Sequence, residues 1–317
     1  MTKTCRCDDG STHTSRDMRE MKKVAGVGSI VLETFAEKDD GPTENDYAKS
    51  SITTLKNTYP LKLMVPSHAS NNNCSWIYPI TFGGGLVGGD EIQMTFHVKK
   101  DCAGLVTGQE STKVYHCEDG SQTHQYTKGT VDQGGLLCVL SDPVVCYKNS
   151  NFTQTQEFRM SSEGNLVYLD WLIGGRVALD ELWLLKSYQN KTDVYIDDKL
   201  VYRDNYHLCD TGPVSVKNAM KSMQVIGSCI ILGNKMKSIA SNLNSTLGRK
   251  QSIGERYDTD FVCSVSPLKY TVDEAVVTGL YIRFMASSST KAYSSVVSYI
   301  VNELEQEIGG NPFQDKY

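Results

Sequence analysis

The chain has 317 residues, of which 39% are hydrophobic and 22% charged, proportions typical of a folded globular protein rather than a disordered one. Its 32 Lys and Arg residues are outnumbered by 37 Asp and Glu and are spread along the chain, so it lacks the basic stripe that a nucleic-acid partner requires. The longest apolar stretch, residues 225–232, falls short of the about 20 residues that cross a bilayer, so no membrane partner is expected.

Residues 1–25 are predicted to form a disordered N-terminal extension. They are rich in Thr, Ser, Asp, Arg and Lys and carry no periodic apolar pattern, so burial cannot offset the entropy of ordering them. The same segment has no apolar core of a secretory signal, which favours a cytoplasmic protein. The ten cysteines are scattered and form no CxxC pair, so reduced thiols are expected.

Residues 26–317 are predicted to form a single β-rich domain. Ile30 and Leu32 begin a pattern of alternating apolar residues, and the same period of two runs through residues 92–98, as in half-buried strands. Further on, two β-rich runs flank Asp197 and Asp198, which predicts a hairpin because Asp is favoured in tight turns.

Two segments have helical rather than strand periodicity. Residues 235–250 place apolar side chains at helical spacing and include Gly248 near their end. Residues 296–308 show one apolar helical face with glutamates outside it, and Gly309 is a suitable stop. The β-branched run before it, residues 276–285, predicts a strand that leads into this helix. A β-dominated unit with a few helices follows from the residues alone.

A glycine-rich segment, GGGLVGGDE at residues 83–91, contains the spacing GxGxxG. In a dinucleotide-binding fold these glycines follow a strand and open a helix. Here the following residues, 92–98, alternate as a strand, so nucleotide binding is not favoured. The glycines are instead expected to supply positive φ angles or close backbone approach in a tight turn.

Two thiol and imidazole pairs are candidate metal ligands: His116 with Cys117, and His207 with Cys209. Each pair supplies only two of the four donors of a structural zinc site, so ordinary residues on half-buried strands are the favoured interpretation. Cys5, Cys7 and His13 offer a further soft-metal set within the N-terminal extension, where disorder is the favoured alternative. No motif of covalent or zinc-dependent catalysis occurs.

Four segments, read in chain order, resemble the UreD (UreH) family of urease accessory proteins over about residues 28–308. They are GGLVGGD at 84–90, LVTGQESTKVY at 105–115, DPVVCY at 142–147, and a segment that begins LDW at 169–171 and ends LVYRD at 200–204. Their common order and spacing are more specific than any one of them alone.

The resemblance implies a mainly β, single elongated fold with two principal α-helices and no catalysis of its own. It also implies a role in nickel insertion and maturation of the urease metallocentre, with apo-urease and UreF as partners and UreG reached through UreF. No resident cofactor is implied, because nickel would only pass through.

Carried over by motif position, the residues implied to line a transient nickel path are Asp90, Glu91, Thr112, Asp170 and Asp204. Oxygen ligands placed in series suit a moving divalent ion, whereas a tight His and Cys cage would retain it. Two alternatives remain open: a metal-dependent enzyme on a β-rich scaffold that uses His116, Cys117, His207 and Cys209, and a β-rich binding module unrelated to nickel.

Overall fold

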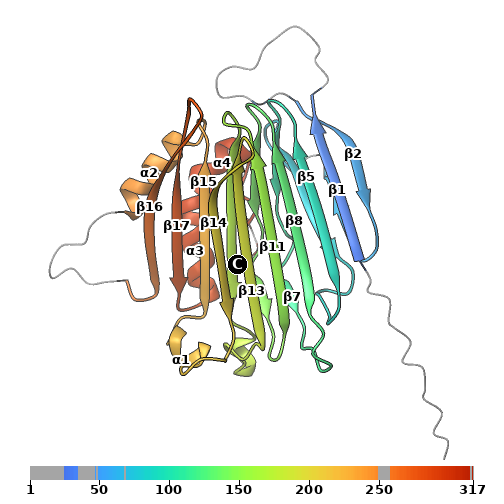
Figure 1. Cartoon of the computed structure of the whole chain (residues 1–317), viewed down its shortest axis with the longest axis vertical. Helices are drawn as coiled ribbons and strands as arrows, with labels where there is room; N and C mark the ends of the chain where they lie inside the picture. Colours follow the sequence, from blue (N-terminus) through green and yellow to red (C-terminus); the bar gives the residue numbers. More distant parts are fainter. Residues whose placement is uncertain are drawn as a thin grey trace, which may run out of the picture.

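The computed structural model describes residues 25–34, 47, 49–67, 69–248, 258–314 and 316. The predicted N-terminal extension, except for Ala25, lies outside the described residues, as do Cys5, Cys7 and His13. Within the described residues, two β-sheets stand face to face and helices cover one side (Figure 1). The mainly β fold with two principal helical segments is therefore confirmed.

The first sheet has seven strands in the order β14-β13-β11-β8-β5-β1-β2. Its five inner strands, β1, β5, β8, β11 and β13, are parallel, and β2 and β14 pair antiparallel at the two edges. The strand bounds are β1 Ala25–Glu33, β2 Ser51–Asn57, β5 Glu91–Val98, β8 Thr123–Val131, β11 Asn151–Met160, β13 Ser187–Ile196 and β14 Lys199–Leu208.

The second sheet follows the order β16-β17-β15-β12-β9-β6-β4-β3, with β10 and β7 paired beside β12. Its strands β4, β6, β9 and β12 are parallel, and the others on the main path join antiparallel. The bounds are β3 Leu61–Met64, β4 Ser75–Thr81, β6 Ala103–Val106, β7 Thr112–Val114, β9 Leu136–Leu140, β10 Val144–Cys146, β12 Asn165–Ile173, β15 Val225–Leu232, β16 Phe261–Val272 and β17 Ala275–Ala286.

Between β4 and β13 the chain coils, so that each turn adds one strand to the first sheet and one or two strands to the second. Parallel neighbours result because every turn runs in the same direction. Inward side chains of the two sheets then meet in one interior, whose apolar members include Phe96, Phe152, Phe158 and Leu172.

A second core lies on the other face of the second sheet, beneath the helices (Figure 1). Here Trp171 and Leu169 face side chains such as Leu243, Ile300 and Leu304. The helical elements are the short η1 Val177–Leu179 and α1 Val216–Met220, then α2 Lys237–Leu247, α3 Ser289–Val296, the π-helical turn Val297–Val301 and α4 Asn302–Ile308. None of the helices in the described part of the chain is long and apolar enough to span a bilayer.

The predicted local elements are present, although the C-terminal helical run begins at Ser289, before the predicted residue 296. Residues 235–250 contain α2, and the C-terminal helical pattern ends at Gly309 in the left-handed conformation, with φ 76°. The hairpin of β13 and β14 turns at Asp197 and Asp198, whose φ angles are 46° and 62°. Asp tolerates this region better than most residues, which explains its use in the turn.

The glycine-rich turn leads into strand β5 and not into a helix, as predicted. Gly89 has a φ of 88°, and Gly88 is needed for space: a Cβ there would lie 2.6 Å from both the Sγ of Cys117 and the Oγ of Ser121. The turn is closed by Asp90, whose Oδ2 accepts a hydrogen bond from the backbone N–H of Val87 at 2.9 Å. Both reasons predicted for the glycines are therefore confirmed.

We predict that Gly88→Val destabilises the protein by about 1–3 kcal/mol, because the larger side chain must displace Cys117 and Ser121. Urea denaturation measures the change. Gly212→Val is the matched control, since a Cβ at Gly212 would meet nothing nearer than 4.0 Å. Equal stability of the two variants would contradict the packing argument.

Candidate functional site

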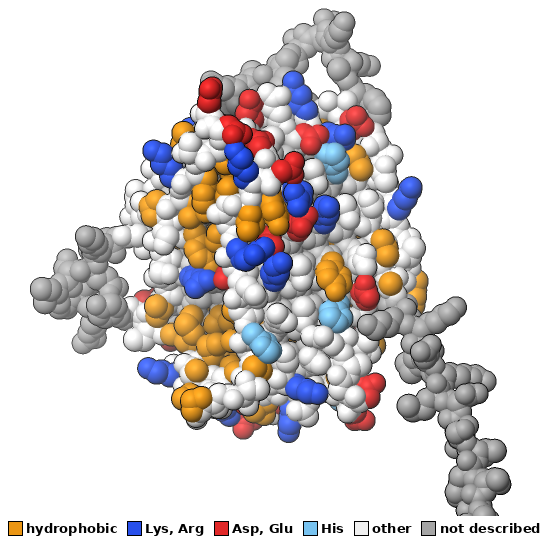
Figure 2. All heavy atoms as spheres, viewed as in Figure 1, with side chains coloured by type: hydrophobic (Ala, Val, Ile, Leu, Met, Phe, Trp, Pro, Cys, Tyr) orange, Lys and Arg blue, Asp and Glu red, His pale blue; other side chains and the backbone are white. Residues whose placement is uncertain are grey.

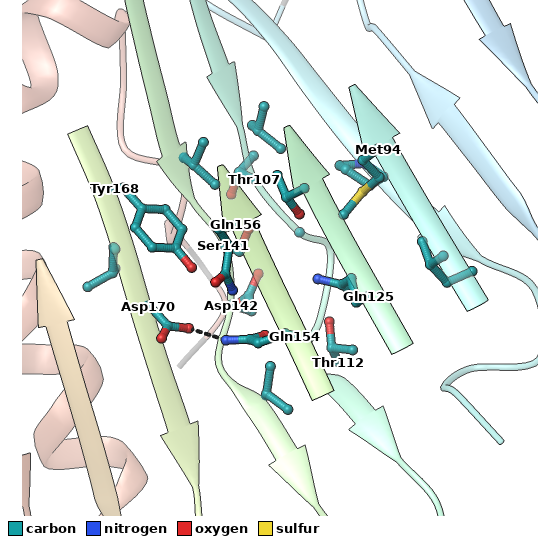
Figure 3. A pocket seen from close by; sticks show the side chains of 18 of the residues that line it. Met94, Thr107, Thr112, Gln125, Ser141, Asp142, Gln154, Gln156, Tyr168 and Asp170 are labelled. Atoms are coloured by element: carbon teal, nitrogen blue, oxygen red, sulfur yellow. Dashed lines mark hydrogen bonds between the residues drawn. The ribbon is translucent and has the colours of Figure 1, made fainter. Parts of the chain in front are cut away.

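A polar cavity of about 100 Å³ lies between the two sheets, within an otherwise apolar interior. Burying polar groups is unfavourable unless they find partners, so a row of them inside a core calls for a functional explanation. Figure 3 shows this row, with side chains from both sheets pointing toward one another. The polar side chains that line the cavity include Thr107, Thr112, Gln125, Thr127, Ser141, Asp142, Gln154, Gln156 and Asp170.

Asp170 is a buried carboxylate at one side of the row (Figure 3). Strand β12 turns its even-numbered side chains inward, so Asp170 faces β11 and β13 of the opposite sheet. Its Oδ1 accepts a hydrogen bond from the Nε2 of Gln154 at 2.7 Å, and its Oδ2 accepts one from the Nδ2 of Asn190 at 3.0 Å (Figure 3 shows the first). Burial raises the pKa of Asp170 to about 6, against the two stabilising hydrogen bonds.

Two buried oxygens near this row lack a partner. The Oγ1 of Thr107 and the Oδ1 of Asn190 accept no hydrogen bond from any described residue. Thr107 lines the cavity, and Asn190 holds Asp170 with the other end of its amide. Buried oxygens of this kind are normally satisfied by water or by a cation, so the interior can accept a small polar guest.

On one side the cavity adjoins a surface hollow of about 350 Å³. The two spaces share four lining residues, Pro79, Thr81, Glu110 and Thr112. Gly84 and Gly85 of the glycine-rich turn form part of the wall of the hollow. A Cβ at Gly85 would lie 2.6 Å from the carbonyl oxygen of Lys113, so the turn packs closely on β7.

Beyond Asp170 lies a second surface pocket, of about 340 Å³, that contains Asp204. Asp204 accepts hydrogen bonds from the Nη2 of Arg283 at 3.0 Å and from the hydroxyl of Tyr281 at 2.9 Å. After burial, its negative charge is a further cause of the raised pKa of Asp170, which places the two carboxylates within electrostatic reach. Figure 2 shows hydrophobic side chains gathered at the lower left of this face. The apolar wall of the pocket includes Ile226, Val262 and Met285.

Two tyrosines lie within electrostatic reach of Asp170. Tyr188 accepts a hydrogen bond on its hydroxyl from the Nε2 of Gln154 at 2.8 Å. Its ring centroid is 5.8 Å from that of Tyr206, which lines the pocket of Asp204. Burial raises the pKa of both phenols well above the usual value, so they remain neutral.

The structure brings together three of the five predicted path residues. Thr112 and Asp170 line the cavity, and Asp204 lies in the next pocket. Asp90 and Glu91 line neither space: Asp90 holds its own turn, and the Oε1 of Glu91 accepts a hydrogen bond from the Nε2 of Gln93 at 2.6 Å.

The thiol and imidazole pairs have local partners. The thiol of Cys117 donates to Asp119 at 2.9 Å, and the Nε2 of His207 lies 2.8 Å from the Oγ of Ser187. Cys209 lies 3.7 Å from the Nδ1 of His207. Among the described residues, no three His, Cys, Asp or Glu side chains gather as ligands of one ion.

The buried amide side chains on the strands that face Asp170 were not predicted as site residues from the sequence. Gln154, Gln156 and Asn190 are buried at inward positions, between Phe152 and Phe158 on β11 and after Tyr188 on β13. The available signal was polar residues in phase with apolar ones on an alternating strand. The alternation by itself does not show that side chains of β11 and β13 converge on the carboxylate of Asp170.

Comparison with known proteins gives consistent matches. The family model described as UreD urease accessory protein matches residues 42–316. Urease accessory protein D of Oryza sativa subsp. indica is 30% identical over 285 residues, which cover 84% of this chain and 91% of that protein. The Arabidopsis thaliana protein of the same name is 30% identical over 283 residues, covering 84% and 95%. Urease accessory protein UreD of Anaeromyxobacter sp. (strain Fw109-5) is 28% identical over 264 residues, covering 83% and 84%.

We predict that Asp170 makes the stability of the protein depend on pH. Its pKa is 3.8 when unfolded and about 6 when folded, so the folded state loses about 3 kcal/mol of stability as the pH rises through this window. Asp170→Asn should remove that loss and gain stability relative to the wild type from pH 4 to pH 7. Urea denaturation at each pH measures it.

Asp273→Asn is the matched control, because it makes the same chemical change at an exposed carboxylate. It should keep the pH profile of the wild type. A profile for Asp170→Asn that also parallels the wild type would show that Asp170 is ionised in the folded protein at low pH, against the environment described above.

Proposed function

The chain belongs to the UreD family of urease accessory proteins, and on that premise we propose that it serves nickel insertion into the urease metallocentre. In this proposal it binds apo-urease and UreF, and it reaches UreG through UreF. The names of its relatives support the part in urease maturation.

The observation that carries the nickel proposal is the polar row inside an apolar core. Thr112 lies where the surface hollow adjoins the cavity, Asp170 lies inside, and Asp204 lies in the pocket beyond. These residues offer oxygen atoms one after another and never a complete cage. Borderline divalent ions such as Ni²⁺ bind oxygen more weakly than nitrogen or sulfur, so serial oxygen ligands favour passage over storage.

Asp90 and Glu91 have a different part in the proposal. Asp90 closes the glycine-rich turn, and that turn forms a wall of the surface hollow. We therefore propose that these two residues shape the approach to the passage. Their substitution should act through the turn rather than through a lost ligand.

A non-catalytic role is part of the proposal. It is supported by relatives named as accessory proteins, and by the separate local hydrogen bonds of the thiol and imidazole pairs. A cytoplasmic location is also proposed, because the eight cysteines among the described residues are all free thiols, as in a reducing compartment.

We predict that Asp170→Ala and Asp204→Ala, each co-expressed with urease and the other accessory proteins, lower the nickel content of urease several-fold. The complex with urease and UreF should still form, because neither side chain offers much surface to a partner. Asp170 is buried, and the side chain of Asp204 is only 13% exposed. The measurement is nickel per urease active site, beside a pull-down of the complex.

His116→Ala is the control, since this exposed side chain has no place in the passage. Full nickel loading with both acidic variants, with the complex intact, would refute the passage through these residues. A larger loss with His116→Ala and Cys117→Ala than with the acidic variants would instead favour the metal-enzyme alternative.

A further inference from the structure

The cavity of Asp170 and the pocket of Asp204 are separate spaces. Among the described residues, the two have no lining residue in common. An ion that moves from one carboxylate to the other therefore has to cross the wall between them. The strand pairing identifies the side chains of that wall, because residues directly opposite each other on antiparallel strands place their Cβ atoms about 4.5–5.5 Å apart.

On the second sheet, the wall is a row of three side chains. Asp170 of β12 lies directly opposite Ser228 of β15, and Ser228 lies directly opposite Arg283 of β17. Asp170 lines the cavity, whereas Ser228 and Arg283 line the pocket. Ser228 is therefore the neighbour of Asp170 on the pocket side. It is a short hydroxyl residue between Ile226 and Ile230, which face the same interior.

On the first sheet, a second row faces the first. Gln154 of β11 lies beside Asn190 of β13, and Asn190 lies directly opposite Tyr206 of β14, which lines the pocket. The Nδ2 of Asn190 donates a hydrogen bond across the interior to the Oδ2 of Asp170 at 3.0 Å. Asp170 thus has Ser228 beside it on its own sheet and Asn190 facing it from the other.

An unpaired oxygen lies at this junction. Asn190 is 1% exposed, and its Oδ1 is a buried acceptor that receives no hydrogen bond from any residue that the structure describes. Because Oδ1 and Nδ2 are bonded to the same carbon, this oxygen lies near the carboxylate that Nδ2 contacts. A buried oxygen in this situation is normally satisfied by water or by a cation.

We propose that Asp170, Asn190 and Ser228 form a binding site for a divalent metal ion at the junction of the cavity and the pocket. The carboxylate of Asp170 supplies negative charge, and the Oδ1 of Asn190 and the hydroxyl of Ser228 supply neutral oxygens. One charged and two neutral oxygens bind a divalent ion weakly, so the ion can leave again. The site is one step of the proposed passage, and its biological role rests on the proposed function.

Arg283 keeps this site weak. Its guanidinium belongs to the next strand beyond Ser228 and donates to Asp204 at 3.0 Å and to the hydroxyl of Tyr281 at 2.7 Å. A fixed positive charge nearby lowers the affinity for a divalent ion, and the carboxylate of Asp204 offsets only part of that charge. The junction therefore favours brief occupancy over storage.

The test replaces the hydroxyl of Ser228 by a thiol in the full chain. A thiolate binds Ni²⁺ more strongly than a hydroxyl does, and charge transfer from sulfur to nickel absorbs in the near ultraviolet. Ser228→Cys with NiCl₂ should show such a band in the difference spectrum against the wild type, which removes the contribution of the native cysteines. The band should weaken several-fold in Ser228→Cys combined with Asp170→Asn.

Ser264→Cys is the matched control. Ser264 lines the same pocket, but it lies opposite Arg283 on β16, on the side away from Ser228. The same chemical change should give no band there. An equal band in Ser264→Cys would overturn the site, and so would a band of full strength without the Asp170 carboxylate. A Ser228→Cys spectrum that matches the wild type would overturn it as well.

Ser228→Ala keeps the proposal testable if the thiol variant fails to fold, since it removes a single oxygen atom. Calorimetric titration of the full chain with NiCl₂ defines the site as the binding that Asp170→Asn removes. Ser228→Ala should weaken that binding several-fold. Unchanged affinity in Ser228→Ala, or equal binding by the wild type and Asp170→Asn, would refute the site.

These measurements need no urease, so the site can fail independently of the proposed function. Loss of nickel delivery in Asp170→Ala and Asp204→Ala, with no band in Ser228→Cys, would retain the passage and remove this site. Normal delivery in both acidic variants, with a band that depends on Asp170, would retain the site and remove the passage.

Discussion

The structure depends on one constraint: two sheets built from alternate strands of a coiled chain must fill a single interior with their inward side chains. Each coil contributes to both sheets, so every inward residue meets residues far from it in sequence. Apolar pairs satisfy the constraint over most of the interior. A polar residue satisfies it only if the facing strands supply hydrogen-bond partners.

Asp170 shows how that condition produces a site. Gln154 and Asn190, from two parallel strands of the other sheet, both direct amide N–H groups at its carboxylate. The two hydrogen bonds stabilise the ionised carboxylate but do not offset the whole effect of burial, because the pKa of Asp170 is still raised to about 6. The carboxylate is therefore held in a fixed position, and a nearby cation would stabilise its ionised form further. A transient ligand requires both properties.

The second core joins the helices to the outer face of the second sheet. Helices α2, α3 and α4 cover the outer face of the second sheet, and Trp171 and Tyr293 meet there. Trp171 points toward the helices, whereas its sequence neighbours Asp170 and Leu172 point inward. Strand β12 therefore contacts the helical layer with one face and the cavity with the other. After the last helix, Phe313 packs against Trp171, and the Nζ of Lys316 donates a hydrogen bond to Asp142 of the cavity lining.

The sequence by itself determined the mainly β class, the hairpin at Asp197 and Asp198, the C-terminal helix ending at Gly309, and the family. These features depend on periodicity, turn residues and motif order, which are local properties of the chain. The parallel coil and the position of each strand could not be predicted from the sequence, because alternation fixes which side chains face inward but not which strand they face.

For the same reason, only part of the candidate site could be predicted from the sequence. Thr112, Asp170 and Asp204 were predicted as site residues from their motifs, but only the tertiary structure placed Asp170 against Gln154 and Asn190 and left Asp90 and Glu91 outside the cavity. Lys316 gave no signal at all in the sequence, since its partner Asp142 lies 174 residues away. Motifs preserve residue identity, whereas the distances that decide coordination and charge pairing arise only when separate coils are packed together.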